Sequence, residues 1–390
     1  MFRKMPFLLL ITILGIMLVN PFLPLEIKQQ FYAISLSIKS LIIFLLPIII
    51  FSLLFKTMMA LSRGATAVIA LILVCVCCSN ALSTFLSHYV GEWIYQFDLT
   101  IVKPNEAQSL TPAWVLQLPK LIANDTAMFS GIILGILLGA SKVPFAHTAA
   151  NVLDKLTAKI LSSFTYLIPF FVAGFVVKLQ HDGVMHTILK DYSIIFVLIA
   201  LAQFAYIFSA YAALARFKLK PFIASIRNML PAAIAGFSTM SSAAAMPLTL
   251  AGVEQNTQNK DLARSVVPAT VNIHLVGDCF AIPIFAYAVM KSFGVAEPSL
   301  LTYLVFVFYF VIAKFSVAAI PGGGIVVMLP ILESYLGFNG EMLSLITALY
   351  ILFDPVITCA NVLGNGAFAK LIDRLQSVVA SGLESRRSAA

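Results

Sequence analysis

Long apolar segments alternate with short polar ones along nearly the whole chain. An α-helix needs roughly 20 apolar residues to cross a bilayer, and more when it tilts. One long polar connection, residues 98–125, separates the third apolar segment from the fourth. The pattern predicts an all-α polytopic membrane protein with eight transmembrane helices, over residues 6–26, 31–60, 65–97, 127–146, 149–179, 187–216, 259–292 and 340–376.

Two further apolar segments, residues 221–256 and 300–337, are interrupted at their centres and predict re-entrant helical hairpins. The first has a serine-rich tip within Gly236–Leu250, and the second has Pro321 followed by three glycines. Irregular backbone at membrane depth is tolerated only where protein buries it or where it lines a cavity. Two such interrupted segments in corresponding positions indicate the binding site of a transporter.

The composition also indicates a membrane protein, because 61% of the residues are hydrophobic, 11% are charged and the mean hydropathy is +0.98. Soluble domains carry roughly 45–50% apolar and about 25% charged residues. The main Lys and Arg positions fall on one side of the predicted bundle, which predicts that both termini are cytoplasmic. The expected location is a bacterial cytoplasmic (inner) membrane. The basic cluster Arg216–Lys220 is interpreted as part of this topology signal, and no nucleic-acid partner is expected.

The first apolar run could be a signal peptide and the cysteines could bind a metal, but neither interpretation is favoured. The run Pro6–Leu25 is longer than a signal-peptide core and has no small-residue cleavage pattern after it, so it is expected to be the first transmembrane helix. Cys75, Cys77 and Cys78 could bind a soft metal, but no histidine or carboxylate is nearby. Packing in lipid is the favoured role for the cysteines, and no metal site is assigned.

The last predicted helix carries four polar residues on one face. Asp354, Thr358, Asn361 and Asn365 follow one another at spacings of four, three and four residues. Such a stripe is either a packing seam or a solute pathway, and a carboxylate at membrane depth marks a functional site by default. Asp354 and Asn361 are therefore predicted to contact a solute or an ion, and Pro355 is expected to disturb the helix locally.

Polar residues also interrupt the helix predicted over residues 259–292. Asn272, His274, Gly277 and Asp278 stand among apolar neighbours, and His274 and Asp278 are four residues apart, so they could face each other. A lone buried histidine is usually only hydrogen-bonded. A histidine and an aspartate together in a membrane segment more often mark a proton or ion route.

The two hairpin tips offer complementary groups. Ser241 and Ser242 supply hydroxyls, and Gly322–Gly324 let backbone amides approach a ligand closely. A flexible turn would explain the glycines alone, but their pairing with the serine tip and the polar stripe favours function. The N-termini of half-helices carry partial positive charge and suit a carboxylate.

Taken together, these segments resemble the dicarboxylate/amino acid:cation symporter family, the glutamate transporter family. Met240–Thr249 is similar to the tip of that family's first hairpin, and Ala319–Gly324 to the tip of its second. Ala269–Asn272 resembles the start of the unwound seventh helix, and Asp354 with Asn361–Gly364 resembles the eighth-helix signature. The resemblance covers nearly the whole chain and implies a homotrimer in the lipid bilayer, each protomer having a scaffold part and a mobile transport part.

The resemblance implies a division of the chain and a role for each candidate residue. Residues 1–126 would form scaffold helices 1–3 and the outer loop, 127–220 helices 4–6 of mixed membership, 221–380 the transport core, and 381–390 a cytoplasmic tail. Asp354 matches the carboxylate that binds a substrate α-amino group, and Asn361 matches the amide that contacts the substrate carboxylate. The implied substrate-binding set is Ser241, Ser242, Ile320, Pro321, Gly322, Gly323, Gly324, Asp354, Ile357, Thr358 and Asn361. The implied ion- or proton-coupling set is Asn272, His274, Asp278 and Asn365.

The chain departs from the family pattern at three positions. Ile357 stands where carriers of acidic amino acids have an arginine, and an apolar side chain cannot neutralise a buried acidic group. His274 and Asn365 stand where the family has sodium-ligating aspartates, although sodium prefers anionic oxygen ligands. Histidine titrates near physiological pH, with an ordinary pKa of about 6.5. A neutral substrate and proton coupling are therefore favoured.

The sequence thus predicts a secondary active symporter, not an enzyme. It would import a small neutral amino acid by elevator-type alternating access, with H⁺ or Na⁺ as coupling cation and no cofactor. The alternatives are a symporter of acidic amino acids or C4-dicarboxylates, and a solute-gated ion channel. An intramembrane enzyme with His274 and Asp278 as acid and base has no nucleophile or metal set in the sequence to support it.

Overall fold

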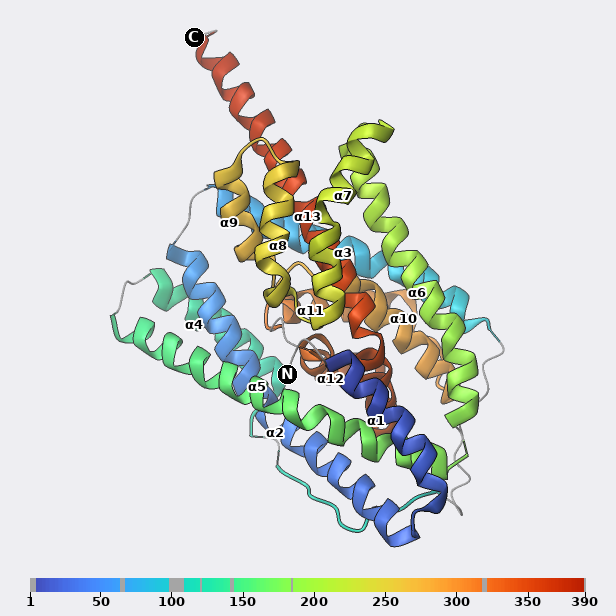
Figure 1. Ribbon diagram of the computed structural model, residues 1–390. Coiled ribbons are helices and arrows are strands. Elements are labelled where there is room, and N and C mark those ends of the chain that lie inside the picture. The colour runs from blue at the N-terminus through green and yellow to red at the C-terminus, as the bar shows by residue number, and fades with distance from the viewer. Residues whose placement is uncertain are drawn as a thin grey trace.

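The computed structural model describes residues 5–63, 67–97, 109–119, 121–140, 144–183, 185–317 and 321–388. Every regular element in these ranges is a helix, which confirms the predicted all-α class for the described part of the chain (Figure 1). The elements are α1 (Met5–Val19), the 3-10 helix η2 (Asn20–Phe22), α2 (Leu25–Arg63), α3 (Ala67–Tyr95), α4 (Asn124–Ala140), α5 (Pro144–His181), α6 (Met185–Leu214), α7 (Leu219–Thr239), α8 (Ser242–Asn256), α9 (Lys260–Thr270), α10 (Val276–Ser292), α11 (Leu300–Lys314), α12 (Gly323–Leu336) and α13 (Gly340–Ser388).

The helix bounds correct several of the sequence-based segments; α2 begins at Leu25 rather than 31, and α4 ends at Ala140 rather than 146. The first segment ends its α-helix at Val19 rather than 26, because a proline-containing 3-10 turn follows it. The segment 259–292 is two helices with irregular backbone between Thr270 and Val276, as the unwound helix of the resemblance implies. The last helix continues past 376 to Ser388 and stays helical through Pro355, where α7 and α10 pack along it.

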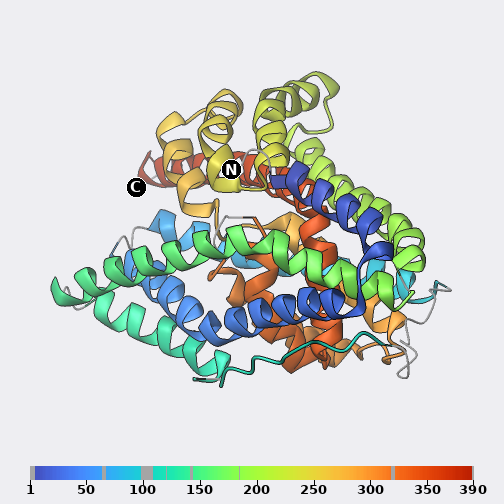
Figure 2. The ribbon, with the colours of Figure 1, turned by 60° about the horizontal axis from the view of Figure 1, so that its bottom comes forward.

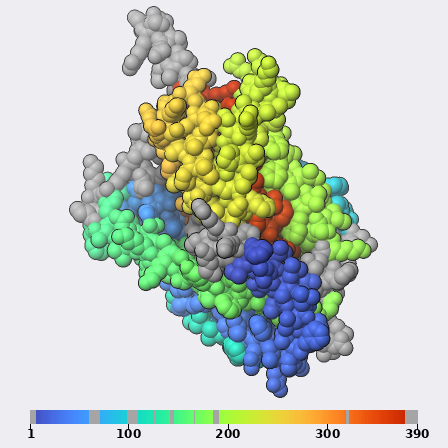
Figure 3. Space-filling model, in the orientation of Figure 1, coloured from blue at the N-terminus to red at the C-terminus, as the bar shows by residue number. Residues whose placement is uncertain are grey.

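Two helix pairs occupy the positions of the predicted hairpins. α7 and α8 lie against each other, and the chain reverses at Met240, which has left-handed backbone with φ of 53°. α11 and α12 pack against each other in the same way, and α12 begins after Gly322, whose φ is 71°. Figure 3 shows the surface of α7, α8 and α9 as one lobe at the top of the molecule.

By length and apolar composition, four described helical stretches could cross a membrane on their own: Leu25–Met59, Leu71–Tyr95, Lys190–Leu214 and Gly340–Gln376. A fifth crossing results if the two parts of α5, which are bent by 40°, count as one. Large apolar side chains such as Leu14, Val197 and Leu201 are exposed on the outer helices, as a lipid-facing surface requires. The crossing count of eight remains a prediction.

The helices form two groups. α2 packs on both α4 and α5, and Figure 2 shows these three helices as a layer in front of α10–α13. α10 and α13 pack on each other, and α3, α6 and α7 surround them. Almost every side chain of α10 is buried, including Asp278 in its first turn. The centre of the fold is therefore the α10–α13 contact, which carries the polar stripe of the last helix.

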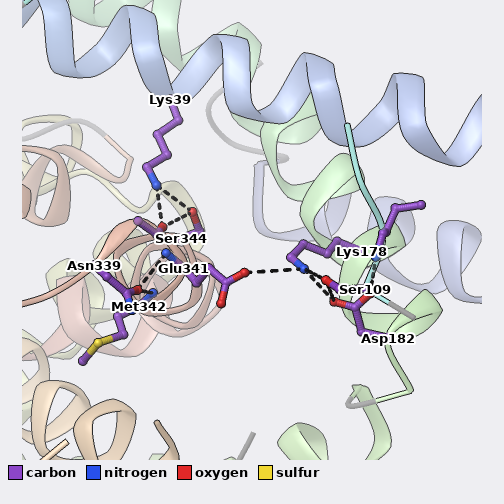
Figure 4. A network of polar contacts seen from close by, with 10 residues as sticks. Lys39, Ser109, Lys178, Asp182, Asn339, Glu341, Met342 and Ser344 are labelled. Atoms are coloured by element: carbon purple, nitrogen blue, oxygen red, sulfur yellow. Dashed lines mark hydrogen bonds and ion pairs between the residues drawn. The ribbon is translucent and has the colours of Figure 1, made fainter. Parts of the chain in front are cut away.

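Polar contacts tie the start of α13 to the α2–α5 layer (Figure 4). Lys39 of α2 donates to the carbonyl of Gly340 and to Ser344 Oγ, the latter at 3.1 Å. Lys178 of α5 pairs with Asp182 at 2.6 Å and approaches Glu341 Oε1 at 3.7 Å. Two lysines of the layer thus reach the first turns of the central helix.

One contact links two of the elements whose basic residues were predicted to share a side. Lys370 of α13 donates to Ser225 Oγ of α7 at 2.6 Å. Ser225 follows Lys218 and Lys220 by about two helical turns. The contact brings a basic residue of α13 against the helix that begins within the basic cluster Arg216–Lys220, and the charge asymmetry across the membrane stays a prediction.

Candidate functional site

The second hairpin tip meets the central helix at Asp354. The backbone amide of Gly322 donates to Asp354 Oδ2 at 2.8 Å, and Thr358 Oγ1 donates to Oδ1 at 2.9 Å. Asp354 is 3% exposed, so its carboxylate has almost no access to water. Gly322 is the N-cap of α12, and an anion at a helix N-terminus is stabilised by the helix dipole. Asp354 itself therefore occupies the anion position of the tip.

The outer side of the tip faces side chains of α2 and α5 across a small apolar cavity. Pro321, Gly322 and Gly323 line an apolar cavity of about 30 Å³, together with side chains of α2 and α5. The nearest side-chain atom to a Cβ built on Gly322 would be Ile168 Cδ1, at 3.4 Å. Ile320, predicted to belong to the tip, lies outside the described residues. The described tip contacts the layer through apolar groups and the core through its amide.

A second polar cluster lies along the same stripe at Asn361. Asn361 Oδ1 accepts from the amide of Gly277 at 2.8 Å, and its Nδ2 donates to Asp278 Oδ1 at 3.2 Å. Tyr350 OH donates to the same Asp278 oxygen at 2.9 Å, and Lys314 Nζ donates to Asp278 Oδ2 at 3.0 Å. The predicted substrate amide is therefore engaged by α10 in this conformation.

The irregular backbone between α9 and α10 is supported by α3. Asn80 Nδ2 donates to the carbonyl of Ile273 at 2.7 Å, and its Oδ1 accepts from the amide of Leu275 at 3.3 Å. Asn80 is fully buried, so one side chain satisfies a donor and an acceptor that a continuous helix would have paired internally. This break positions His274 apart from α10.

His274 and Asp278 do not face each other, contrary to the sequence-based expectation. The helical spacing on which that expectation rested fails, because α10 begins only at Val276. His274 Nε2 bonds to Ser79 Oγ at 2.8 Å, and its ring lies 4.3 Å from that of Phe368. Asp278 bonds instead to Lys314, Tyr350 and Asn361. Asp278 is therefore not in place to stabilise a protonated His274.

His274 faces a cavity of about 290 Å³. Its side chain lies beside that of Asn365, and neither His274 Nδ1 nor the Asn365 amide forms a hydrogen bond of good geometry with any other described residue. The two residues in the sodium positions of the family pattern thus share an unsatisfied polar region. The cavity is lined by Ser79, Tyr206, Ile207, Ala210, Ala213, Leu214, His274, Val276, Gly364, Ala367, Phe368 and Leu371.

The first hairpin tip is buried near the stripe. Ser241 caps α8 by accepting from the amide of Ala244 at 3.2 Å, and Ser242 is 4% exposed. A Cβ on Gly236, one turn before the tip, would lie 3.3 Å from the carbonyl of Thr358. Gly236 thus packs against α13 at the level of Thr358. Asn272, by contrast, is exposed.

Four residues of these clusters were not singled out from the sequence. Lys314 is the only charged residue of apolar α11, and the rarity of charge at membrane depth was the signal that could have found it. Tyr350 lies four residues before Asp354, on the face of the stripe. Ser79 and Asn80 follow the cysteines of the third segment, and nothing in their spacing connects them with His274.

Comparison with known proteins agrees with this geometry. The family model described as the sodium:dicarboxylate symporter family matches residues 98–375. The chain is 26% identical to excitatory amino acid transporter 1 of Ambystoma tigrinum over 281 residues, which are 71% of the chain and 51% of that protein. It is also 26% identical to the human protein of that name over 254 residues, 64% of the chain and 46% of the relative. The serine/threonine transporter SstT of Streptococcus thermophilus is 24% identical over 279 residues, 67% of each chain. The chain thus spans about half the length of the excitatory transporters it matches.

Proposed function

Since the chain belongs to the sodium:dicarboxylate symporter family, we propose that it is a secondary symporter of a small neutral amino acid with a cation. The observation that carries the proposal is the hydrogen bond between Gly322 and Asp354. This bond joins a backbone donor at a helix N-terminus to a carboxylate that has no ionic partner among the described residues. An amino acid zwitterion carries the complementary groups to both.

Substrate binding would exchange this internal bond for two ligand contacts. The α-ammonium of the substrate would pair with Asp354. The α-carboxylate of the substrate would accept hydrogen bonds from the tip amides, including the Gly322 amide that now donates to Asp354. The exchange requires the tip to move away from Asp354, and the small apolar cavity behind Gly322 leaves room for the first part of that movement. Thr358 and Asn361 would complete the polar wall of the site.

A neutral side chain is favoured by the charges of the site. Ile357 is fully buried one turn from Asp354, where carriers of acidic amino acids have an arginine by the resemblance. Lys314 is a described cation in the second polar cluster, and its charge is already neutralised by Asp278. A second substrate carboxylate would thus be buried without a partner, which is costly. The name of one relative, a serine/threonine transporter, agrees with small neutral substrates.

The two groups of helices suggest how the site would change sides. We assign α2, α4 and α5 to a scaffold, and the two hairpins with α9, α10 and α13 to a part that moves across the bilayer. The Lys39 and Lys178 contacts to the start of α13 would then break and re-form with each cycle. A homotrimer in a bacterial cytoplasmic membrane, with both termini cytoplasmic, completes the proposal.

The coupling cation is proposed to be a proton, with sodium at a backbone-rich site as the alternative. The position of His274 beside Asn365 and at the 290 Å³ cavity supports a proton site. Ser79 and Asn365 would have to stabilise the added charge, since the residues that line the cavity include no carboxylate. A single mobile cation would balance the charge left on Asp354 and Asp278 against Lys314 when a zwitterion is bound.

Counterflow into proteoliposomes tests the proposed function. Vesicles loaded with unlabelled serine should accumulate labelled serine, and vesicles loaded with glutamate should not. Vesicles with the Asp354→Asn protein serve as control. A solute-gated channel would equilibrate label without exchange, and preferential exchange of glutamate or a C4-dicarboxylate would establish the alternative substrate class.

A further inference from the structure

The most deeply buried ion pair of the described core is formed by Lys314 and Asp278. Lys314 ends α11 in the second hairpin and is 0% exposed, and Asp278 in the first turn of α10 is 1% exposed. Their Nζ and Oδ2 atoms are 3.0 Å apart. Lys314 Nζ also lies 4.5 Å from the ring centroid of Phe310. The pair joins the hairpin that carries the glycine tip to the central helices.

Three side-chain donors surround the carboxylate of Asp278. Tyr350 OH and Asn361 Nδ2 occupy the other carboxylate oxygen of Asp278, at 2.9 and 3.2 Å. A Cβ on Gly324 would lie 2.4 Å from Asp278 Oδ2 and 2.3 Å from Tyr350 OH, so the glycine tip is pressed against the same group. A carboxylate and a hydroxyl beside close backbone are the ligand types that hard cations take. The position is filled by a lysine ammonium.

Stability alone does not account for such a pair. Burying two charges costs solvation energy that their attraction only partly offsets, and a well-packed apolar pair of similar volume is often at least as stable. The pair also contacts the polar stripe directly, because Asn361 of the stripe donates to Asp278. Asn361 stands seven residues after Asp354 on the same helix. A structural brace would not need to be placed there.

We propose that the ammonium of Lys314 is a built-in cation that replaces one mobile coupling cation at Asp278. The inference rests on the proposed cation symport and deepens it. With Lys314 in place, Asp278 needs no alkali ion when the core closes, and the hairpin that carries the ammonium is the same one that must move to admit substrate. The wild-type chain therefore needs one fewer mobile cation per transport cycle than a core in which Asp278 and Asp354 both lack an ionic partner.

Removal of the ammonium should create a cation site. In Lys314→Gln, the Asp278 carboxylate and the Tyr350 hydroxyl would face the volume that the ammonium leaves, and a small alkali ion could bind there. The protein should then gain a saturable stabilisation by sodium, because a ligand that binds only the folded state stabilises it by mass action. A lysine that acts only as a brace would leave a variant that is destabilised equally in every salt.

The test is the thermal stability of purified full-length protein without any amino acid, in sodium chloride against choline chloride at equal ionic strength. Lys314→Gln should gain a saturable rise in Tm of about 3 °C or more in sodium over that of the wild type. Adding Asp278→Asn to this variant should remove the gain. Lys291→Gln is the matched control, since Lys291 of α10 lies over the Tyr95 ring at 4.9 Å and forms no ion pair with a described carboxylate.

An identical sodium response in the wild type, Lys314→Gln and Lys291→Gln would overturn the proposal. So would a gain that persists with Asp278→Asn. Lys314→Met is a second variant with the same expected gain. The proposal predicts that sodium rescues both variants, so it is contradicted if neither can be purified as folded protein even in high sodium. Because no substrate is present, these outcomes are independent of whether serine is the transported solute.

Discussion

The amide of Gly322 and the carboxylate of Asp354 form a hydrogen bond of 2.8 Å that closes the second hairpin tip onto the central helix. The bond joins the two features that the sequence marked most clearly, a glycine-rich interruption and a carboxylate at membrane depth. It also shows that the two features satisfy each other's hydrogen-bonding groups. Opening the tip frees a donor and an anion together, which suits a zwitterion.

Asp354→Asn should abolish uptake while the protein still folds and assembles. The asparagine Oδ1 can still accept from the amide of Gly322, and its Nδ2 can donate to the Thr358 hydroxyl, so the tip can close, but the amide cannot neutralise a substrate ammonium. Proteoliposome uptake is the measurement, with size-exclusion chromatography in detergent as the control for assembly. Near-normal uptake would remove Asp354 from the site or indicate a substrate without an amine.

Ile357→Arg should shift preference toward acidic amino acids. The guanidinium would stand one helical turn from Asp354 and could pair with a second substrate carboxylate. Competition of serine uptake by unlabelled glutamate should become at least about tenfold more effective, a change of about 1.4 kcal/mol in relative affinity. The reading fails if the wild type already prefers glutamate and the variant leaves that preference unchanged.

Gly324→Ala should reduce both uptake and stability. The added Cβ would lie 2.3 Å from Tyr350 OH and 2.4 Å from Asp278 Oδ2, so the tip could not keep its place without a shift. Overpacking of this kind costs about 1–3 kcal/mol. Gly15→Ala in α1 is the matched control, because its Cβ would meet nothing within 4 Å. Equal thermal unfolding of the two variants would contradict the predicted close approach.

His274→Gln should remove accumulation driven by a pH gradient without sodium. Glutamine can still bond to Ser79, but it cannot carry a proton at physiological pH. The groups around His274 in the described structure are Ser79, Tyr206, Asn365 and Phe368, and none supplies a negative charge at neutral pH. Accumulation driven only by sodium, and unchanged in the variant, would refute proton coupling.

The sequence pattern predicted the helices and the polar stripe because both depend on local periodicity. Asp354, Thr358 and Asn361 are buried on α13 as their spacing indicates. The spacing argument failed for His274 and Asp278, since it assumed a continuous helix where Asn80 of a distant segment stabilises a break. No local pattern encodes such a partner.

Lys314 shows a different limit. Its charge within an apolar segment was visible in the sequence, but its meaning depends on Asp278, 36 residues away. Likewise, the polar stripe predicted that Asn361 faces other elements, whereas only the fold shows that α10 already binds it. Pairings between helices thus determine which polar residues are free to bind a solute.

The account depends most directly on Asp354 being an anion that awaits the ammonium of a neutral amino acid. Equilibrium binding of labelled L-serine to purified protein, with competition by L-glutamate and by a deaminated analogue of serine, measures this claim. We predict saturable serine binding that Asp354→Asn abolishes, with little competition by glutamate or by the analogue. Tight binding of glutamate, or equal competition by the analogue that lacks the amine, would contradict it.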